Sequence, residues 1–203
     1  ELAASGIEPI IHDSALLYPP GAIRNAAGGP FRVFTPFWRR LRTRLAELPA
    51  VLPAPRRLPA LDRAPMSLPL DELQLLPAVR WDAGLAQRWQ PGEAGARRRL
   101  VRFVAAGLAH YVDARERPGE PGTSSLSPHL HFGEVSPRQV HAALQPLSAA
   151  GSEAFLRQLG WREFAAHLLH HFPHTTSEPL DARYAGFGWR DRERSLPVTA
   201  DTI

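Results

Sequence analysis

A run of prolines between residues 49 and 69 is the strongest constraint on how this chain can fold. Proline has no backbone N–H and fixes φ at about −65°, so a closely spaced series excludes both a helix interior and a central strand. The series consists of Pro49, Pro53, Pro55, Pro59, Pro65 and Pro69. We therefore predict an extended linker over residues 49–85, with one folded part before it, residues 1–48, and a second after it, residues 86–203.

The composition is that of a globular protein with a modest positive charge. Of the 203 residues, 44% are hydrophobic and 22% are charged, which is enough to build a core. All 24 basic residues are arginine, and with 20 acidic residues the net charge is +4. The arginine bias, together with abundant alanine, proline and glycine, indicates a GC-rich coding sequence. A charge of this size permits a polyanionic partner such as a nucleic acid but does not require one.

The residue types that are missing exclude several classes of protein. The chain has no cysteine, which excludes disulfides, thiolate metal sites and a cysteine nucleophile. No apolar run approaches the roughly 18 residues of a membrane span. We expect a cytoplasmic monomer with no membrane partner. The first residue is Glu1 and the single methionine is Met66, so we expect the chain to start inside a longer reading frame.

The part before the linker has the pattern of an α/β unit. The apolar run in GIEPIIHDSALL, residues 6–17, predicts a strand followed by a loop. In FRVFTPFWRRLRTRLAEL, residues 31–48, Thr35 is a suitable N-cap and Pro36 a suitable first helical residue. Apolar residues recur there at helical spacing, and arginines occupy the other face. We interpret that arginine face as solvated rather than phosphate-binding.

The part after the linker has a helical pattern. Periodic apolar positions predict helices over residues 92–115, 137–144 and 153–172. The apolar stripe of the first helix consists of Leu100, Val104, Leu108 and Tyr111. The fold class that we predict is therefore mainly α, with a small α/β part ahead of the linker.

The segment TSSLSPHLHFGEVSPRQV, residues 123–140, places two helix starts close together. Ser127 followed by proline has the pattern of an N-cap and a first-turn proline, which predicts the start of a short helix. Gly133 can end this helix in a left-handed conformation. Ser136, three residues before Gln139, has the spacing of a capping box at the second start.

The same loop offers donors that suit a phosphate. Helix N-termini present unpaired N–H groups and a partial positive charge. Hydroxyls ahead of the first helix come from Thr123, Ser124, Ser125 and Ser127. Two interpretations stay open: a diphosphate-bearing cofactor binds here, or the hydroxyls only cap their own helices.

A second informative segment is FLRQLGWREFAAHLLHHFP, residues 155–173. On a helix, one side of this segment carries Phe155, Gln158, Trp161, Arg162 and Ala165. An aromatic ring, an amide, an indole and a guanidinium on one face can stack a flat ring and hydrogen-bond its edges. The alternative is a helix that is buried all round, with its tryptophan in the core.

The histidines do not give the pattern of a metal site. His167 and His171 are four residues apart on this helix, and His129 and His131 lie in the preceding loop. No acidic residue stands beside the helical pair as in H-E-x-x-H, and a site needs three or four ligands. We therefore predict no metal site. A P-loop is impossible without lysine, and no Ser-His-Asp order is present.

These segments resemble one known family. The loop TSSLSPHLHFGEVSPRQV is similar to the flavin-binding loop of the photolyase/cryptochrome family, and FLRQLGWREF is similar to the helix that follows it there. FTPFWRRL resembles the exit from that family's antenna domain, and PLDARYAGFGWR resembles the segment after the flavin-loop helices. The resemblance implies that residues 1–48 are the C-terminal remnant of an α/β antenna domain. It also implies that residues 86–203 are the first part of a helical FAD-binding domain.

The resemblance also implies roles for individual residues. The implied FAD-binding residues are Tyr111, Thr123, Ser124, Leu126, Ser127, Phe155 and Arg162. Gln158 and Trp161 fall at the implied catalytic positions, and Trp161 matches the tryptophan against which a flipped pyrimidine dimer stacks. Arg115 matches an arginine that binds DNA phosphate, so Arg115 and Trp161 are the implied DNA-binding residues.

The chain departs from the family pattern in several places. Gln158 stands where photolyases for cyclobutane dimers usually carry glutamate, and an amide cannot share a proton with the dimer radical anion as a carboxyl can. Ser125 replaces a residue that is often arginine. The antenna strands and the family's later G-Y-P motif are not found here, so we expect the site of the folate or deazaflavin antenna chromophore to be missing and FAD to be held weakly. The last residues, DRERSLPVTADTI, do not resemble the family.

The activity that the resemblance implies is light-driven repair of pyrimidine dimers by electron transfer from reduced FAD. The implied partner is then damaged DNA, and the reaction is that of a carbon–carbon lyase. A cryptochrome-like flavin photosensor without repair activity is the alternative that Gln158 favours. An inactive remnant is a third hypothesis.

Overall fold

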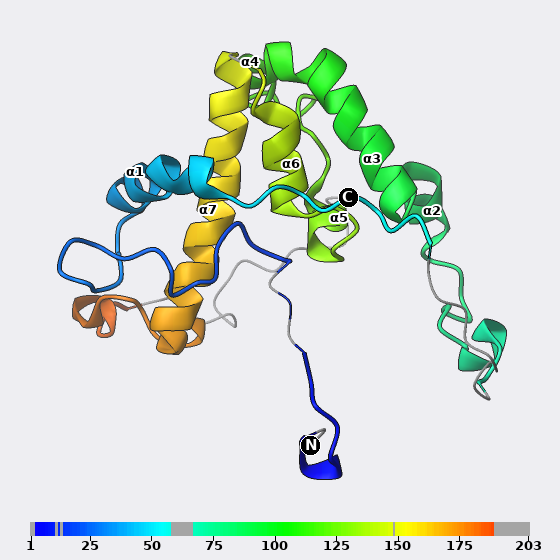
Figure 1. Ribbon diagram of the computed structural model, residues 1–203, viewed down its shortest axis with the longest axis horizontal. Coiled ribbons are helices and arrows are strands. Elements are labelled where there is room, and N and C mark those ends of the chain that lie inside the picture. The colour runs from blue at the N-terminus through cyan, green and yellow to red at the C-terminus, as the bar shows by residue number, and fades with distance from the viewer. Residues whose placement is uncertain (1–2, 11, 13, 58–66, 148, 189–203) are drawn as a thin grey trace.

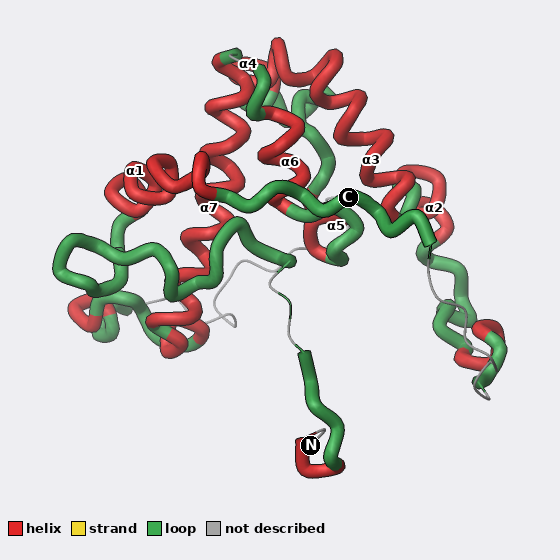
Figure 2. Tube along the Cα trace, in the orientation of Figure 1, coloured by secondary structure: helices red, strands yellow, loops and turns green. Residues whose placement is uncertain are grey.

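The computed structural model describes residues 3–10, 12, 14–57, 67–147 and 149–188, and the regular structure within them is helical (Figure 1, Figure 2). The α-helices are α1 (Phe34–Arg44), α2 (Ala83–Arg88), α3 (Glu93–Arg102), α4 (Tyr111–Ala114), α5 (Ser127–His131), α6 (Pro137–Leu144) and α7 (Ala150–His171). The 3₁₀ segments are η1 (Ala3–Ser5), η2 (Leu45–Glu47), η3 (Leu70–Leu73), η5 (Leu108–His110), η6 (Pro173–Thr176) and η7 (Ala182–Tyr184), and η4 (Phe103–Gly107) is a π-helical turn. The mainly α fold is confirmed.

The strand that we predicted over residues 6–17 is wrong for the described part of that segment. The backbone there is coil, both Ile7 and Ile10 are exposed, and Figure 1 shows the stretch of residues 3–10 running away from the helices, whereas Leu17 is buried against α7. A strand is stabilised by pairing with a neighbouring strand, and none occurs in the part of the chain that the structure describes. An apolar run therefore does not make a strand here.

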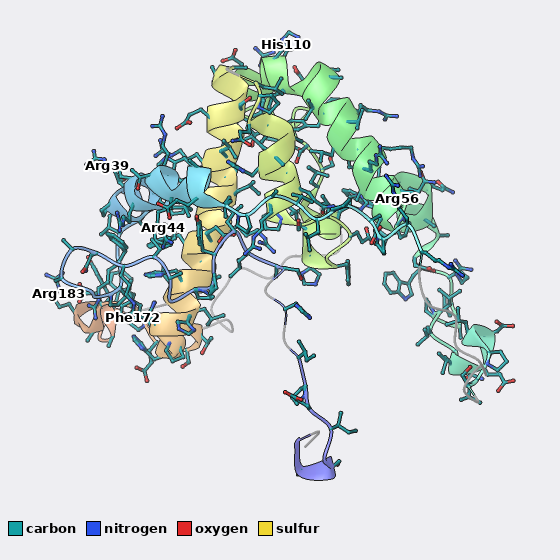
Figure 3. The ribbon with its side chains drawn as sticks, viewed as in Figure 1. Arg39, Arg44, Arg56, His110, Phe172 and Arg183 are labelled. Carbon is teal, nitrogen blue, oxygen red and sulfur yellow. The ribbon has the colours of Figure 1, made fainter. Side chains whose placement is uncertain are left out.

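Helix α1 begins one residue earlier than its predicted cap. Val33 occupies the N-cap position, no side chain caps the helix start, and Thr35 lies inside the first turn. Phe34 extends the helix because its ring is buried against α7. The amphipathic pattern is confirmed: Phe37 is buried, whereas Arg39 is exposed and points away from the body of the molecule (Figure 3).

The helix that we predicted over residues 92–115 forms with an irregular middle. α3 follows Gly92, whose φ of 90° lies in a region that glycine tolerates and other residues do not. The chain then widens to π geometry in η4 and continues through η5 and α4, near His110 at the upper end of the molecule in Figure 3. The predicted stripe lies in the core, with Leu100, Leu108 and Tyr111 buried and Val104 packed against them.

Helix α7 is the element on which two hydrophobic clusters meet. The first cluster draws on α3 to α6 and includes Phe155 and Leu159 of α7. The second draws on α1 and the coil before it and includes Phe164 of α7, while Leu156 packs against both clusters. Figure 1 shows α7 running through the molecule, with α1 on one side and α3 on the other. The chain on both sides of the proline-rich segment thus packs on one helix, and the division into domains stays a prediction.

The close approach of α1 to α7 depends on Gly160. A Cβ atom at this position would lie 2.5 Å from Cε3 of Trp38, closer than van der Waals contact allows. Glycine costs roughly 1 kcal/mol of helix stability relative to alanine. At this position that cost is offset because the indole of Trp38 packs directly on the backbone of α7.

Glu163 of α7 is a buried carboxylate that holds the coil before α1. Each of its oxygens accepts a hydrogen bond from the backbone N–H of Leu17 at 3.0 Å, and one also accepts from that of Tyr18 at 3.4 Å. Burial raises the pKa of Glu163 to about 7, and the two N–H donors, Arg162 and Arg138 oppose the rise. The carboxylate therefore serves as an anchor at an electrostatic cost.

One turn further on, His167 holds a second point of the same coil. Its Nε2 accepts from the backbone N–H of Phe31 at 3.0 Å, and its Nδ1 donates to the carbonyl of Pro20 at 3.1 Å. A protonated imidazole has no acceptor, so this pair of bonds requires neutral His167. Burial lowers the pKa of His167, which favours the neutral form.

The linker that we predicted is described over residues 49–57 and 67–85. It is coil there apart from η3, a few turns and the start of α2, and its apolar side chains, including Leu52 and Trp81, are largely exposed. Residues 58–66 and the tail that begins at residue 191 lie outside the described residues. Within the described chain, no helix combines the length and the apolar character that crossing a bilayer requires.

The first testable prediction concerns the pH dependence that Glu163 gives to stability. Because its pKa is raised from 4.5 to about 7, the folded chain holds a proton over this range that the unfolded chain releases. The contribution of this group to the free energy of unfolding is therefore fully present below the unfolded pKa of 4.5, and it is lost as the pH rises through the folded pKa of about 7. The Glu163→Gln variant keeps a carbonyl acceptor and does not titrate. The free energy of unfolding of the wild type minus that of the variant should fall by roughly 2–3 kcal/mol between pH 4.5 and 8.

Urea unfolding followed by circular dichroism at a series of pH values measures this difference. The histidines are present in both proteins, so their titration cancels in the subtraction. A difference that stays flat, or that rises with pH, would contradict the burial of an ionisable carboxyl at this position.

Candidate functional site

The hydroxyl-rich loop ahead of α5 is fixed by a buried leucine. Leu126 lies in the core, and its N–H donates to Oγ of Ser124 at 3.3 Å. Ser125 has a φ of 52°, in the left-handed region that residues other than glycine adopt at a cost. The loop therefore turns sharply beside the core and leaves Thr123 and Ser127 exposed.

The first helix start differs from the prediction in its cap. α5 begins at Ser127 itself, Leu126 occupies the N-cap position, and no side chain caps this start. Gly133 follows the helix with a φ of 71°, as predicted. The hydroxyl of Ser127 is therefore not used to cap its own helix.

The second helix start has the capping box that we predicted. Oγ of Ser136 accepts from the N–H of Gln139 at 3.1 Å, and Oε1 of Gln139 accepts from the N–H of Ser136 at 2.7 Å. The serine hydroxyl of α6 is thus an internal cap. The separate alternative that the hydroxyls ahead of α5 only cap their own helix does not hold for Ser127.

Hydroxyls and guanidinium groups share one cavity beside this loop. Thr123, Ser124 and Ser125 line a cavity of about 520 Å³. The rest of its lining is Gln87, Arg88, Arg99, Arg102, Phe103, Ala106, Gly107 and Pro121. Phosphate oxygens accept hydrogen bonds from both kinds of donor, and a guanidinium adds charge. This donor set fits a diphosphate.

Tyr111 and Phe155 lie in the hydrophobic core. They are 4% and 6% exposed, their ring centroids are 5.2 Å apart, and Phe103 packs on both rings. Burial raises the pKa of Tyr111, and the guanidinium of Arg115, 5.6 Å from the ring centre, opposes the rise. Arg115 is partly exposed and pairs with Glu116 at 2.9 Å. The structure thus brings Tyr111 and Phe155 together, and their contact with a flavin stays a prediction.

Gln158 and Trp161 lie on a face of α7 that is accessible to solvent. Trp161 is 46% exposed, so the alternative of a helix buried all round is wrong. One face of its indole stacks on the buried ring of Phe34, with centroids 3.6 Å apart and planes within 9° of parallel. The guanidinium of Arg157 lies 5.6 Å from the ring centre of Phe34. Helix α1 therefore holds the indole flat against a fixed ring.

Arg162 is engaged by the backbone of two other segments. Its guanidinium donates to the carbonyl of Ala15 and, at 3.5 Å, to that of Leu130 in α5. It also lies 3.9 Å from the carboxylate of Glu163. Arg162 thus links the coil before α1 to α5, and its role toward a cofactor stays a prediction.

The loop histidine His129 forms a short contact with Glu134. Its Nδ1 lies 2.5 Å from Oε2 of Glu134, and Glu134 also accepts from the N–H of Gly92 at 2.7 Å. The bonds from Gly92 and His129 lower the pKa of Glu134. This pair ties the start of α3 to the end of α5. In the described part of the chain, no three histidine or acidic residues are grouped so as to hold a metal ion.

Sequence reasoning missed two parts of this arrangement. It did not identify Phe34 as the ring behind Trp161, because a stack between residues so far apart leaves no spacing signal. It also did not assign the arginines of ARRRLVR, residues 96–102, to a cavity. That run of arginines was a visible signal, but only the fold shows that Arg99 and Arg102 face the hydroxyl loop.

Comparisons with known proteins agree on one family. The family model described as DNA photolyase matches residues 1–57. A deoxyribodipyrimidine photo-lyase of Agrobacterium fabrum is 38% identical over 186 residues, which cover 89% of this chain and 39% of that protein. Cryptochrome-1 of Arabidopsis thaliana is 30% identical over 206 residues, which cover 93% of this chain and 29% of that protein.

A solved structure is similar as well. The crystal structure of a bacterial class III photolyase from Agrobacterium tumefaciens has a TM-score of 0.81 and 35% sequence identity to this chain, covering 96% of this chain and 41% of that one. This chain therefore spans less than half the length of the relatives named here. On these grounds the chain belongs to the photolyase/cryptochrome family.

Proposed function

We propose that this protein uses reduced FAD and light to repair pyrimidine dimers in DNA. The observation that carries the proposal is the cavity in which Thr123, Ser124 and Ser125 meet the guanidinium groups of α2 and α3. In a chain of this family, 38% identical to a deoxyribodipyrimidine photo-lyase, such a donor set supports a flavin dinucleotide as the ligand.

The diphosphate of FAD would be held by the hydroxyl loop. Thr123 and Ser124 supply hydroxyl donors to the cavity and Arg102 supplies positive charge, while Ser127 at the start of α5 lies three residues further along the chain from Ser124. Leu126 anchors the loop in the core so that these donors are fixed before a ligand arrives. When bound, reduced FAD supplies the photo-excited electron that splits a pyrimidine dimer.

The exposed face of α7 would receive the lesion. Chemistry on a base in a duplex requires that the base leave the stack, and an aromatic surface must replace its neighbours. Phe34 covers one face of Trp161, which leaves the indole free to stack a flipped pyrimidine on its other face. Gln158, one turn away on α7, can donate to a pyrimidine carbonyl, and Arg115 can pair with a DNA phosphate.

A photosensor without repair activity is the second candidate function, and Gln158 is the residue that favours it. An amide at this position donates a hydrogen bond but has no exchangeable acidic proton. The similarity to Cryptochrome-1 supports the same candidate. Repair and sensing share the flavin site, so only the fate of a dimer separates them.

The second prediction tests the diphosphate site. The double variant Thr123→Val with Ser124→Ala removes two hydroxyl donors, and hydrogen bonds to a charged acceptor contribute about 1.5–3 kcal/mol each. We expect the dissociation constant for FAD to rise at least tenfold, measured by quenching of flavin fluorescence. Thr43→Val is the matched control, because Thr43 is exposed on α1 and its hydroxyl donates to the carbonyl of Arg40 within the same helix. Equal affinity of the double variant and the control would contradict the site.

The third prediction separates repair from sensing. The protein, supplied with reduced FAD and an oligonucleotide that carries one thymine dimer, should restore the two thymines under near-ultraviolet or blue light and not in the dark. Chromatography of the digested oligonucleotide measures the yield. Gln158→Glu should raise the yield per absorbed photon several-fold, because a carboxyl can share a proton with the reduced dimer. Flavin binding without any loss of dimers in either protein would favour the photosensor.

The fourth prediction concerns lesion binding by Trp161. Stacking of a base on an aromatic side chain contributes about 1–3 kcal/mol. Trp161→Ala should therefore weaken binding of dimer-containing DNA about tenfold or more, while undamaged DNA binds as before. Fluorescence anisotropy in the dark measures both affinities. Trp81→Ala removes an exposed tryptophan from the segment before α2 and should change neither affinity. A general loss of DNA binding in Trp161→Ala would count against a stacking role.

A further inference from the structure

Helices α2 and α3 carry a cluster of arginines that extends beyond the proposed diphosphate site. A second cavity of about 520 Å³ lies between these helices. Its lining includes Arg88, Trp89, Arg98, Arg99 and Arg102, which we call the arginine groove. In Figure 1, α2 and α3 lie on the side of the molecule away from α1. The lesion-binding face proposed for Trp161 belongs to a different part of the fold, where α7 meets α1.

The positive charges of the arginine groove are not balanced by carboxylates. Among the described residues, no ion pair includes any arginine of the groove. The carboxylate of Asp82, the residue before α2, is paired with Arg80 at 2.9 Å. Four guanidinium groups around one cavity repel one another, and an anion bound among them would relieve the repulsion.

A helix-end role does not account for these arginines. Cations are stabilising in the last turn of a helix, where carbonyl groups have no partner. The backbone of α3 continues in helical geometry into η4, and the N–H of Phe103 is bonded to the carbonyls of Arg99 and Leu100. Arg98 lies in the interior of this continuous helix. Its position is therefore better explained by what the cavity binds.

An ordered indole stands in the wall of the same groove. The guanidinium of Arg99 lies 4.7 Å from the ring centre of Trp89 and also donates to the carbonyl of Arg88 at 3.4 Å. The ring of His129 meets Trp89 edge to face at 6.2 Å. Trp89 is thus held between α3 and α5. An aromatic ring beside guanidinium groups is the combination by which proteins hold a base next to its phosphate.

The groove is longer than a single phosphate requires. It adjoins the cavity of the hydroxyl loop, since Gln87, Arg88, Arg99 and Arg102 line both. Arg98 lines only the end that contains Trp89, away from the hydroxyls. A diphosphate held at Thr123 and Ser124 would leave the Trp89 end free. Several guanidinium groups in a row beside an aromatic ring fit a chain of phosphates better than one anion.

We propose that the arginine groove binds the backbone of single-stranded nucleic acid, with a base resting on Trp89. This binding requires no lesion, no flavin and no light, and it therefore goes beyond the proposed repair function. A strand held here would keep the protein on nucleic acid through an electrostatic contact that is independent of sequence.

The fifth prediction tests this proposal with the flavin-free protein in the dark. The probe is a fluorescein-labelled oligothymidylate without damage, and anisotropy is measured over a series of salt concentrations. Arg98→Ala should raise the dissociation constant about five- to tenfold at low salt, and it should lower the slope of log affinity against log salt by about 0.7, the value for one phosphate contact on a single strand.

Arg97→Ala is the matched control. It removes the same charge from the neighbouring position of α3, and Arg97 is exposed and lines neither cavity. We expect less than a twofold change and an unaltered salt slope. Arg98→Lys should restore the salt slope. Trp89→Leu should weaken binding but leave the salt slope unchanged. Circular dichroism confirms that each variant is folded, and Arg98→Gln, which removes the charge but keeps a long polar side chain, supplies the same test if Arg98→Ala is not.

Three outcomes would overturn the proposal. Equal effects of Arg97→Ala and Arg98→Ala would show that only the overall charge matters. Competition by adenosine monophosphate as effective, per phosphate, as competition by unlabelled oligothymidylate would show a site for free nucleotides. An oligonucleotide affinity that does not depend on salt would exclude phosphate contacts. None of these outcomes involves a dimer or FAD, so failure here is distinct from failure of the repair function.

Discussion

The hydrogen bonds that the carboxylate of Glu163 accepts from the backbone N–H groups of Leu17 and Tyr18 are the interaction on which the candidate site depends most. They fix the coil before α1 on α7, and His167 fixes the same coil one turn further on. Because the coil leads directly into α1, these bonds determine where Phe34 meets Trp161. A buried carboxylate with a raised pKa costs stability. Without the hydrogen bonds that Glu163 accepts, however, the coil that leads into α1 would be released, and α1 orients the exposed indole of Trp161.

Local signals in the sequence predicted those parts of the fold that depend on neighbours in the chain. The capping box at Ser136 and the left-handed Gly133 both occur as predicted, because each is determined within four residues. The strand over residues 6–17 fails because a strand needs a partner that no periodicity reveals. Gly160 escaped notice for the same reason: its importance comes from Trp38, which lies on another helix.

The candidate site divides in the same way. The hydroxyls of Thr123 and Ser124 could be identified from sequence because a phosphate cradle is built from consecutive residues. The guanidinium groups that share their cavity come from α2 and α3, and no local rule joins Arg88 to Ser124. The stack of Trp161 on Phe34 likewise joins residues on α7 and α1. In this protein, local chemistry identifies one half of each binding surface, and tertiary packing supplies the other half.

Charge shows why composition alone was a weak guide to partners. A net charge of +4 on 203 residues is modest, and it averages over very different surroundings. Arg44, Arg80 and Arg183 each pair with a carboxylate, whereas the arginines around Trp89 form no ion pair with any residue that the structure describes. An anion responds to the local field of unpaired groups within about one Debye length, roughly 8–10 Å at physiological salt, rather than to the total charge. The distribution of ion pairs therefore locates a polyanion surface that the net charge cannot indicate.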